Sequence, residues 1–329
     1  MPIFGRWISL SIIACTVGTP AIARAEAAAP EAPNTANAPA AAADPDAATA
    51  AASEASTPAA SPDSNDADVG PKTRKPRKRW TIDVASDSFA LVNDAKGLSL
   101  HKPMFLLPAT YSGRYPGNSS EVLFNLSLKL RVFDTPVYFA YSQKSFFQAL
   151  NGDKSKPFRE NNFNPEAFYR LVPDDENRAK WWYLASDFGI EHESNGKSLP
   201  DSRSWNRIYI APYYERDNTL VYWKWWYRLP EEKNRAATDP KRDDNPDIQD
   251  YYGYTELQVQ QRLFNRHQIS ATFRYNPTTA RGAVGVNYTI PGKNDYFFWT
   301  FYLWQGYGES LLDYDRSVTR VGVGISLAR

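Results

Sequence analysis

From about Met104 onward, hydrophobic and polar residues alternate along the chain with a period of two. The clearest example runs from Phe124 to Val132, where every second residue is Phe, Leu or Val and the residues between are polar or charged. Because successive side chains of a β-strand point to opposite faces, this alternation predicts strands with one apolar and one polar face. The same alternation recurs at 256–263, 269–275, 284–290 and 321–327.

Clusters of Pro, Gly, Asn and Asp divide this region into about 12 segments, each close to the roughly ten residues that cross an outer membrane as a strand. No segment has the roughly 18 consecutive apolar residues that a membrane-spanning helix needs. An even strand number is typical of single-chain outer-membrane barrels. We predict strands at 104–112, 121–132, 136–148, 163–173, 180–194, 203–214, 218–229, 248–263, 266–276, 281–291, 295–306 and 317–328.

The polar faces of these strands carry many charges, for example Lys129, Arg131, Glu256 and Arg262. In a membrane barrel the apolar face contacts lipid and such charges pair inside a polar lumen. The chain also has 10 tryptophans, 20 tyrosines and 17 phenylalanines, which fits aromatic girdles at the two membrane interfaces. The fold class we predict is all-β, a 12-stranded antiparallel transmembrane β-barrel of the outer membrane.

Three regions of different composition precede or form the predicted barrel domain. Residues 1–25 combine a short basic start, an apolar stretch and small residues up to Ala25, which indicates a secretory signal peptide. Residues 26–80 are rich in Ala, Pro, Ser and Asp and are expected to be a disordered linker. Residues 81–329 are the predicted barrel domain.

The single cysteine, Cys15, lies inside the predicted signal peptide; a lipid-modified Cys15 is the alternative interpretation. Once that peptide is removed, no disulfide, thiol nucleophile or cysteine metal site remains. The linker ends in the basic run 72–79, interpreted either as a contact with anionic lipid or cell wall or as a solvated segment. The net charge of +1 gives no support for nucleic-acid binding.

Polar residues interrupt the lipid-facing side of two neighbouring predicted strands. His192 continues the face that carries Phe188 and Ile190, Ser194 follows on the same face, and Asn206 shares a face with Ile208. Because polar side chains facing lipid are costly, three of them converging on one outer surface indicate a function.

These three residue types suit hydrolysis of an ester. The His192 imidazole can take the proton of the Ser194 hydroxyl during attack, and the Asn206 carbonyl oxygen can hold the second ring nitrogen in the right tautomer. Backbone N–H groups at Ser194 and Gly196 are candidates for the oxyanion hole, with a metal ion as a further candidate. The alternative is that His192 is a histidine at the membrane interface with its hydrogen bonds satisfied and no catalytic role. We interpret His101 and His267 as ordinary interface or loop residues.

The segment 189–196, running into 202–207, resembles the active-site block of the outer membrane phospholipase A family. The resemblance spans about residues 99–329, although the last three residues, 327–329, lack the terminal aromatic usual in outer-membrane barrels. Other stretches similar to the family are 101–103, 142–145, 157–160, 250–254 and 306–311.

The resemblance implies a 12-stranded barrel in the outer membrane of a Gram-negative bacterium. It implies calcium-dependent hydrolysis of the sn-1 and sn-2 acyl esters of glycerophospholipids and of lysophospholipids. Ser194 would be the nucleophile, His192 the base and Asn206 the residue that orients His192. One calcium ion per active site would bind the Ser202 hydroxyl and the Lys197 carbonyl, completed across a dimer interface by Ser155.

The resemblance also implies regulation by dimerisation, with a resting monomer and an active homodimer. Gln143 matches the polar residue at the centre of the family's interface and shares a predicted lipid-facing stripe with Val137, Phe139 and Tyr141. Burial against a second subunit would satisfy this amide; a position near the aqueous rim is the alternative. The competing functions are a non-catalytic barrel (channel, adhesin or anchor) and an outer-membrane protease, neither of which needs an outward trio of His192, Ser194 and Asn206.

Overall fold

The structure is a computed structural model that describes residues 88–152, 158–173, 184–232, 239, 242–293 and 297–328. The predicted signal peptide, the predicted linker and Ser155 lie outside the described residues. None of the helices in the described ranges is long and apolar enough to cross a membrane.

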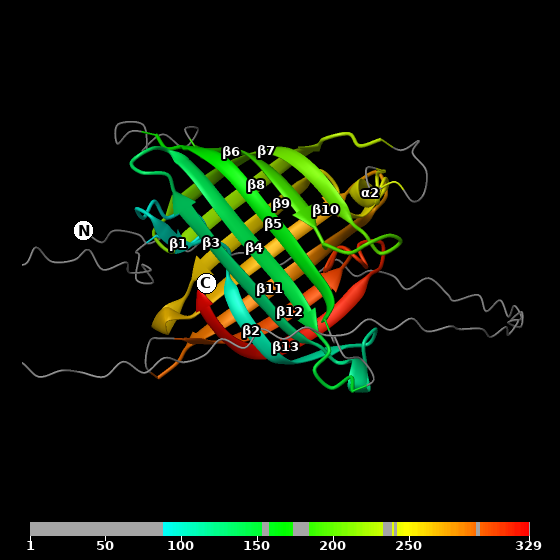
Figure 1. The fold of residues 1–329 in the computed structure, drawn as a ribbon. Coiled ribbons are helices and arrows are strands. Elements are labelled where there is room, and N and C mark those ends of the chain that lie inside the picture. The colour runs from blue at the N-terminus through cyan, green and yellow to red at the C-terminus, as the bar shows by residue number, and fades with distance from the viewer. Residues whose placement is uncertain are drawn as a thin grey trace, which may run out of the picture. The chain divides into compact units, whose positions relative to one another are not determined.

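Twelve antiparallel strands form a closed barrel, as the sequence predicts (Figure 1). The barrel strands are β2 (Met104–Ser112), β3 (Val122–Arg131), β4 (Val137–Phe147), β5 (Phe158–Leu171), β6 (Ala185–Ser194), β7 (Ser204–Arg216), β8 (Thr219–Arg228), β9 (Thr255–Arg262), β10 (Gln268–Asn276), β11 (Arg281–Pro291), β12 (Phe298–Gly306) and β13 (Val318–Ala328). Each strand pairs with its neighbour in sequence, and the pairing of β13 with β2 closes the barrel. Closure leaves no exposed strand edge, which lipid cannot satisfy.

Short elements complete the described chain. They are β1 (Leu98–Leu100), the 3-10 helices η1 (Gly117–Ser119) and η2 (Phe264–Arg266), and the helix α2 (Ile248–Tyr252). The β1 strand pairs with β3 beyond the point where β2 leaves it, so β1 and β2 share one edge of β3.

One predicted strand was wrong at its beginning. Instead of a strand over 248–263, the chain forms α2 and then β9, with Gly253 between them at a φ of 70°. A residue in this left-handed conformation ends a helix, and glycine adopts it without a steric penalty. The strand predicted at 163–173 also begins earlier, at Phe158.

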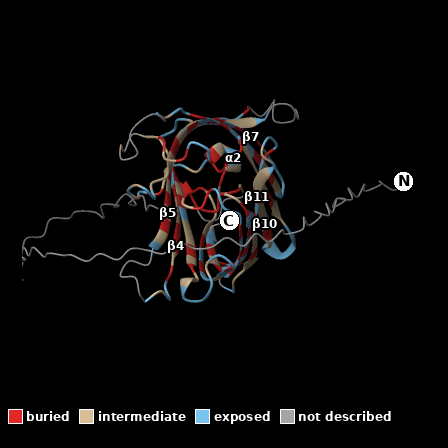
Figure 2. Cartoon of the chain, turned by 90° about the vertical axis from the view of Figure 1, so that its right-hand side faces the viewer, coloured by how far each residue is buried: buried red, intermediate tan, exposed pale blue. Residues whose placement is uncertain are grey.

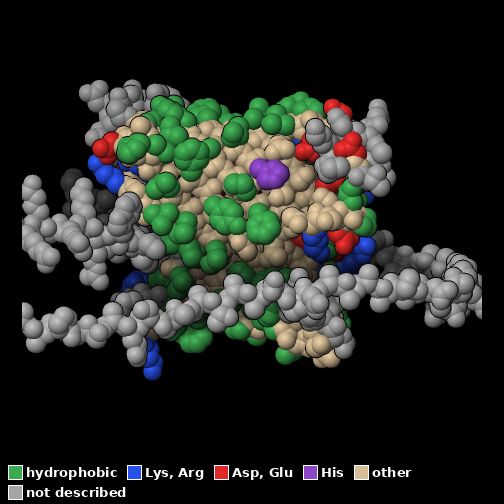
Figure 3. Space-filling view, viewed as in Figure 1, with side chains coloured by type: hydrophobic (Ala, Val, Ile, Leu, Met, Phe, Trp, Pro, Cys, Tyr) green, Lys and Arg blue, Asp and Glu red, His purple; other side chains and the backbone are tan. Residues whose placement is uncertain are grey.

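The two faces of the strands have opposite polarity, as predicted for a membrane barrel. On β6 the outward Phe188 and Ile190 are 44% and 59% exposed, whereas Asp187 just before them and Glu191 just after them are buried. Buried and exposed residues alternate in this way along the strands (Figure 2). Hydrophobic side chains cover much of the outer face, with histidine among them (Figure 3).

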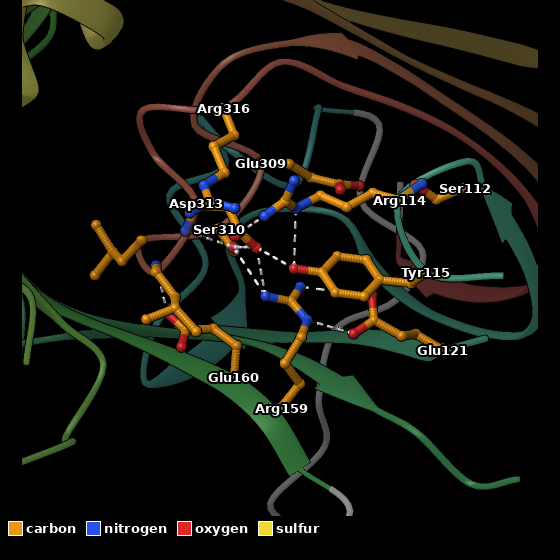
Figure 4. A network of polar contacts seen from close by, with 12 residues as sticks. Ser112, Arg114, Tyr115, Glu121, Arg159, Glu160, Glu309, Ser310, Asp313 and Arg316 are labelled. Atoms are coloured by element: carbon orange, nitrogen blue, oxygen red, sulfur yellow. Dashed lines mark hydrogen bonds and ion pairs between the residues drawn. The ribbon is translucent and has the colours of Figure 1, made fainter. Parts of the chain in front are cut away.

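Buried ion pairs line the lumen. Arg159 pairs with Glu121 and, at 2.7 Å, with Asp313 (Figure 4). Arg320 binds Glu121 at 2.6 Å and Glu309 at 2.8 Å. The shared carboxylate of Glu121 thus links β5, β13 and the loop before β3, satisfying charges that low-dielectric surroundings would otherwise penalise.

His101 lies in the short connection between β1 and β2, so it is a loop residue as expected, but its side chain is buried in the lumen. Its Nε2 lies 2.8 Å from Glu166 Oε1. His267, which follows η2, also lies in a connection, with Nδ1 2.6 Å from the Tyr288 hydroxyl.

The connection after β6 (195–203) and the connection after β8 (described at 229–232, 239 and 242–254) begin at the same end of the barrel, because β6 to β9 are consecutive antiparallel strands. The turns at 217–218 and 263–267, at the opposite end of these strands, are short. Outer-membrane barrels place long loops outside the cell and short turns in the periplasm. The two long loops therefore meet at the outer end, beside the predicted catalytic residues.

Candidate active site

His192 on β6 and Asn206 on β7 lie directly opposite each other in the strand register, on the outer face of the barrel. His192 Nδ1 and Asn206 Oδ1 are 2.9 Å apart, within hydrogen-bond distance. Ser194 lies two residues beyond His192 on the same face of β6, opposite Ser204. All three predicted catalytic residues are half-buried rather than solvent-exposed.

The hydrogen bond to Asn206 defines the tautomer of His192. A carbonyl oxygen only accepts, so Nδ1 carries the proton and donates, which leaves the lone pair on Nε2. The amide of Asn206 is itself oriented, because its Nδ2 donates to Glu231 Oε1 at 3.0 Å. Glu231, which follows β8, was not predicted, and no spacing in the sequence connects it to Asn206.

The loop 195–203 is held by the buried side chain of Asn195. Its Oδ1 accepts from the backbone N–H of Lys197 (3.2 Å) and of Arg203 (3.0 Å), while its Nδ2 donates to the Asp201 carbonyl (2.8 Å). Gly196 has a φ of 64°, and an added Cβ would lie 3.1 Å from the Phe163 ring. The turn that carries the predicted oxyanion and calcium residues is therefore held by hydrogen bonds of the chain itself.

The predicted calcium residue Ser202 donates its hydroxyl to Asp244 Oδ2 at 2.5 Å. The other oxygen of Asp244 is buried and has no hydrogen-bond partner among the described residues. Arg228 places this loop by binding Asp243 at 2.6 Å and the Asn245 carbonyl at 3.1 Å.

A hydroxyl and an unpartnered carboxylate oxygen are hard ligands of the kind that calcium prefers, so these residues fit the metal. Asp244 was not predicted, although the acidic run 243–247 was a signal for it. The described ranges contain no group of three or more His, Cys, Asp or Glu side chains able to hold a metal. A calcium ion at this position would need its remaining ligands from waters, backbone oxygens or a second subunit.

The lumen side of β6 and β7 is fixed by charge. Arg207 Nε lies 3.1 Å from Glu191, and Arg207 Nη2 lies 2.8 Å from Glu193. Glu193 also accepts from the Trp205 indole at 3.1 Å. These buried contacts, directly behind His192 and Asn206, hold the two strands in register.

An apolar groove of about 340 Å³ begins at His192 and Asn206 and runs along the outer surface. Its floor includes Pro165 and Ala167, small side chains between the larger Phe139 of β4 and Ile190 of β6. The volume is at the low end of ligand pockets. A flexible hydrocarbon chain suits such a narrow groove with almost no polar lining.

Gln143 lies on the outer face of β4, as predicted, and is half-buried. Its amide has partners within the same strand: Tyr141 donates its hydroxyl to Oε1 at 3.0 Å, and Nε2 donates to Ser145 at 3.1 Å. A single subunit therefore already supplies two hydrogen bonds to the Gln143 amide, which was expected to find its partners in a second subunit.

Comparison with known proteins places this geometry in context. The family model described as Phospholipase A1 matches residues 90–327. A phospholipase A1 of Salmonella typhimurium is 36% identical over 225 residues, which cover 67% of this chain and 73% of that protein.

Two solved structures are similar to the barrel. The Salmonella typhi outer membrane phospholipase dimer with bound calcium is 32% identical, with a TM-score of 0.61, and the match covers 73% of this chain and 97% of that chain. An active-site mutant of outer membrane phospholipase A from Escherichia coli, with asparagine replaced by alanine, is 32% identical, with a TM-score of 0.60, covering 70% and 91%.

Proposed function

Because the chain belongs to the phospholipase A1 family of outer-membrane enzymes, we propose that it hydrolyses the acyl esters of membrane phospholipids through Ser194, His192 and Asn206. The observation that carries this proposal is the 2.9 Å contact between His192 and Asn206 on the lipid-facing surface. A channel, an anchor or a protease gives no reason for that arrangement. The asparagine-to-alanine active-site mutant of the Escherichia coli relative supports the role of Asn206.

In the proposed reaction, His192 Nε2 accepts the proton of the Ser194 hydroxyl as Ser194 Oγ attacks the ester carbonyl carbon. The tetrahedral intermediate collapses to an acyl-serine ester, and His192 returns the proton to the departing glycerol oxygen. Water then attacks the acyl-enzyme, with His192 again as the base, and releases the fatty acid and free Ser194. Asn206 stabilises the imidazolium that forms in both halves, and backbone N–H groups at Ser194 and Gly196 face the oxyanion.

Calcium would be held by the Ser202 hydroxyl and the Lys197 carbonyl, with Ser155 of a second subunit completing the site. Asp244 would be a further oxygen ligand, since its buried Oδ1 has no hydrogen-bond partner among the described residues. When bound, the ion supplies positive charge beside the oxyanion. The calcium-bound dimer of the Salmonella typhi relative supports both the metal and the dimer.

The groove beside His192 would bind one acyl chain and lead its ester carbonyl to Ser194. A second subunit docked over Gln143 would form the other wall of this groove, so that the acyl chain of the substrate would lie between the two subunits. Substrates would include sn-1 and sn-2 esters as well as lysophospholipids. The enzyme would be silent as a monomer and active as a homodimer.

The test is fatty acid release from detergent-solubilised phospholipid, measured with calcium and with excess chelator, for the wild type and Ser194→Ala. The proposal expects calcium-dependent release by the wild type and none by the variant. Equal release under all four conditions would reject it. Crosslinking during turnover tests separately whether the active form is a dimer. Full activity of a purified monomer would reject the dimer while leaving the proposed hydrolysis intact.

A further inference from the structure

The catalytic asparagine has an acidic partner on the side away from the histidine. Asn206 Oδ1 faces His192 Nδ1 at 2.9 Å, and Asn206 Nδ2 donates to Glu231 Oε1 at 3.0 Å. Imidazole, amide and carboxylate therefore form one continuous hydrogen-bonded chain.

The backbone holds Glu231 in this place. Leu229 N donates to the Asn206 carbonyl at 2.8 Å, which extends the pairing of β7 past the end of β8. Glu231 lies two residues further on, with a side chain that is only 19% exposed. Its Oε2 lies 3.9 Å from Arg228, so that ion pair is loose and leaves the carboxylate directed at Asn206.

We propose that Glu231 is a positioning residue that makes Asn206 act as the acidic member of a Ser-His-Asp triad. This inference rests on the proposed function and adds a fourth residue to its machinery. Asn206 is neutral and cannot by itself balance the charge of an imidazolium. A carboxylate bonded to its NH₂ group polarises the amide, which increases the negative charge on Oδ1, because chains of hydrogen bonds strengthen one another at low dielectric.

Glu231 also fixes which way the amide faces. The oxygen and nitrogen ends of an amide are nearly equal in shape, so a half-turn would present the NH₂ group to His192. Nδ1 would then have to accept, the proton would move to Nε2, and Nε2 would no longer accept the serine proton. A carboxylate only accepts, so its contact with Nδ2 excludes that half-turn.

The first experiment compares kcat and KM of Glu231→Ala, Glu231→Gln and Glu231→Asp, assayed on full-length protein in detergent with calcium and a soluble ester. We expect Glu231→Ala to lower kcat about tenfold at nearly constant KM, a magnitude typical for residues that orient a catalytic group. Glu231→Gln keeps an acceptor but loses the charge and should fall between Ala and the wild type; Glu231→Asp should restore part of the loss. Glu232→Gln removes the same charge from the next residue, which is exposed, and should leave kcat unchanged.

The second experiment is a double-mutant cycle with Asn206→Ala. If Glu231 acts through Asn206, then Glu231→Ala has no further effect once Asn206 is replaced. Wild-type kcat in Glu231→Ala, or losses that multiply in the double variant, would overturn the inference. A wild type without calcium-dependent, Ser194-dependent hydrolysis would instead reject the proposed function, and urea unfolding of each variant identifies losses caused by misfolding.

Discussion

Asn206 lies directly opposite His192 in the antiparallel pairing of β6 and β7, with Asn206 Oδ1 2.9 Å from His192 Nδ1. Side chains opposite each other in a sheet are close enough for such a bond without any loop to position them. The orientation of the proposed base is therefore set by the strand register. That register is in turn held from the lumen side by Arg207 between Glu191 and Glu193.

Two substitutions of Asn206 should distinguish the effect on kcat of orienting His192 from the effect of a negative charge beside it. Asn206→Ala should lower kcat about 100-fold, less than the roughly 10⁴-fold loss when the acid of a Ser-His-Asp triad is replaced. In Asn206→Asp the carboxylate can still accept from His192, but it faces Glu231 where an NH₂ group stood 3.0 Å away. We expect intermediate activity that rises when Glu231→Gln is added.

The measurement is kcat for the four proteins: each single variant at Asn206, and each with Glu231→Gln. If Asn206→Ala retains wild-type kcat, Asn206 has no catalytic role here. If Glu231→Gln lowers the activity of Asn206→Asp further, then repulsion between Glu231 and the new carboxylate at position 206 is not what limits that variant.

The strands were predictable because lipid and lumen impose opposite polarity at every step of an outer-membrane strand. On β3, Leu126 and Leu130 are exposed and Lys129 is buried, as the alternation of apolar and polar residues predicts. The helix α2 was missed because its five residues are too short to express a 3.6-residue period. The burial of His101 was not predicted, because it depends on contacts with residues such as Glu166, which is distant in sequence.

The residues of the candidate active site also divide into those that a local sequence pattern predicts and those that it does not. The common face of His192 and Ser194 follows from a spacing of two, and the opposition of Asn206 follows from the adjacent strand. Glu231 and Asp244 approach from the loop between β8 and β9, whose path is set by tertiary contacts such as Arg228 with Asp243. No local pattern encodes such contacts, and the role of Ser155 stays a prediction from the family resemblance.

Asp244 provides a direct test of the calcium site. Asp244→Asn keeps the shape and a hydrogen-bond acceptor for Ser202 but removes the charge that would attract a cation. We expect the calcium concentration for half-maximal activity to rise about tenfold. Calorimetric titration of calcium into the purified protein should show the same loss of affinity.

Asp315→Asn is the matched control, because Asp315 is an exposed acid in the loop after β12. Its calcium response should equal that of the wild type. Identical calcium affinity in Asp244→Asn and the wild type would show that Asp244 is not a ligand.

Ala167 should determine which acyl chains fit the groove. Ala167→Phe places a large side chain between Phe139 and Ile190, so it should block the part of the groove away from His192. We expect kcat/KM for long-chain phospholipids to fall about tenfold, since a lost apolar contact region in a pocket is worth about 1–3 kcal/mol. Short-chain esters should be hydrolysed as before.

The assay compares long-chain and short-chain substrates for each variant. Val284→Phe adds the same bulk to another exposed outward position, on β11, and should leave the ratio of the two rates unchanged. An unchanged ratio in Ala167→Phe would mean that the acyl chain binds elsewhere.

The pH profile should report the charge of Glu231. Burial is the main cause that raises the pKa of Glu231. The nearby charge of Arg228 and the hydrogen bond from Asn206 lower this pKa, while the charges of Asp243 and Asp244 raise it, and the net shift is upward. Glu231 therefore takes up a proton at a higher pH than an ordinary glutamate as the solution is acidified. Because protonation removes the charge behind Asn206, activity should begin to fall at that higher pH.

Glu231→Gln has no such proton to gain, so the acid limb of its kcat/KM profile should lie at lower pH than that of the wild type, with a lower plateau. Glu232→Gln should reproduce the wild-type profile. Coincident acid limbs in Glu231→Gln and the wild type would argue that the carboxylate does not influence the base.

Arg170 should be a major source of stability at the other end of the barrel. It binds both oxygens of Asp187 at 2.7 Å and also donates to the backbone carbonyls of Leu91, Val92 and Asn93, which lie inside that end. Arg170→Met leaves Asp187 buried without its partner, which typically lowers the free energy of unfolding by about 3–5 kcal/mol. The midpoint of urea unfolding in detergent should fall accordingly.

Two further variants distinguish lost charge pairing from lost packing. Adding Asp187→Leu to Arg170→Met removes the stranded charge and should restore part of the stability, with the backbone carbonyls still unsatisfied. Lys96→Met breaks a pair with Asp134 in which the two side chains are 75% and 77% exposed. It should change the free energy of unfolding by less than about 1 kcal/mol. Equal effects of Arg170→Met and Lys96→Met would mean that the buried pair contributes no more than a surface pair and that the order of residues 91–93 depends on other contacts.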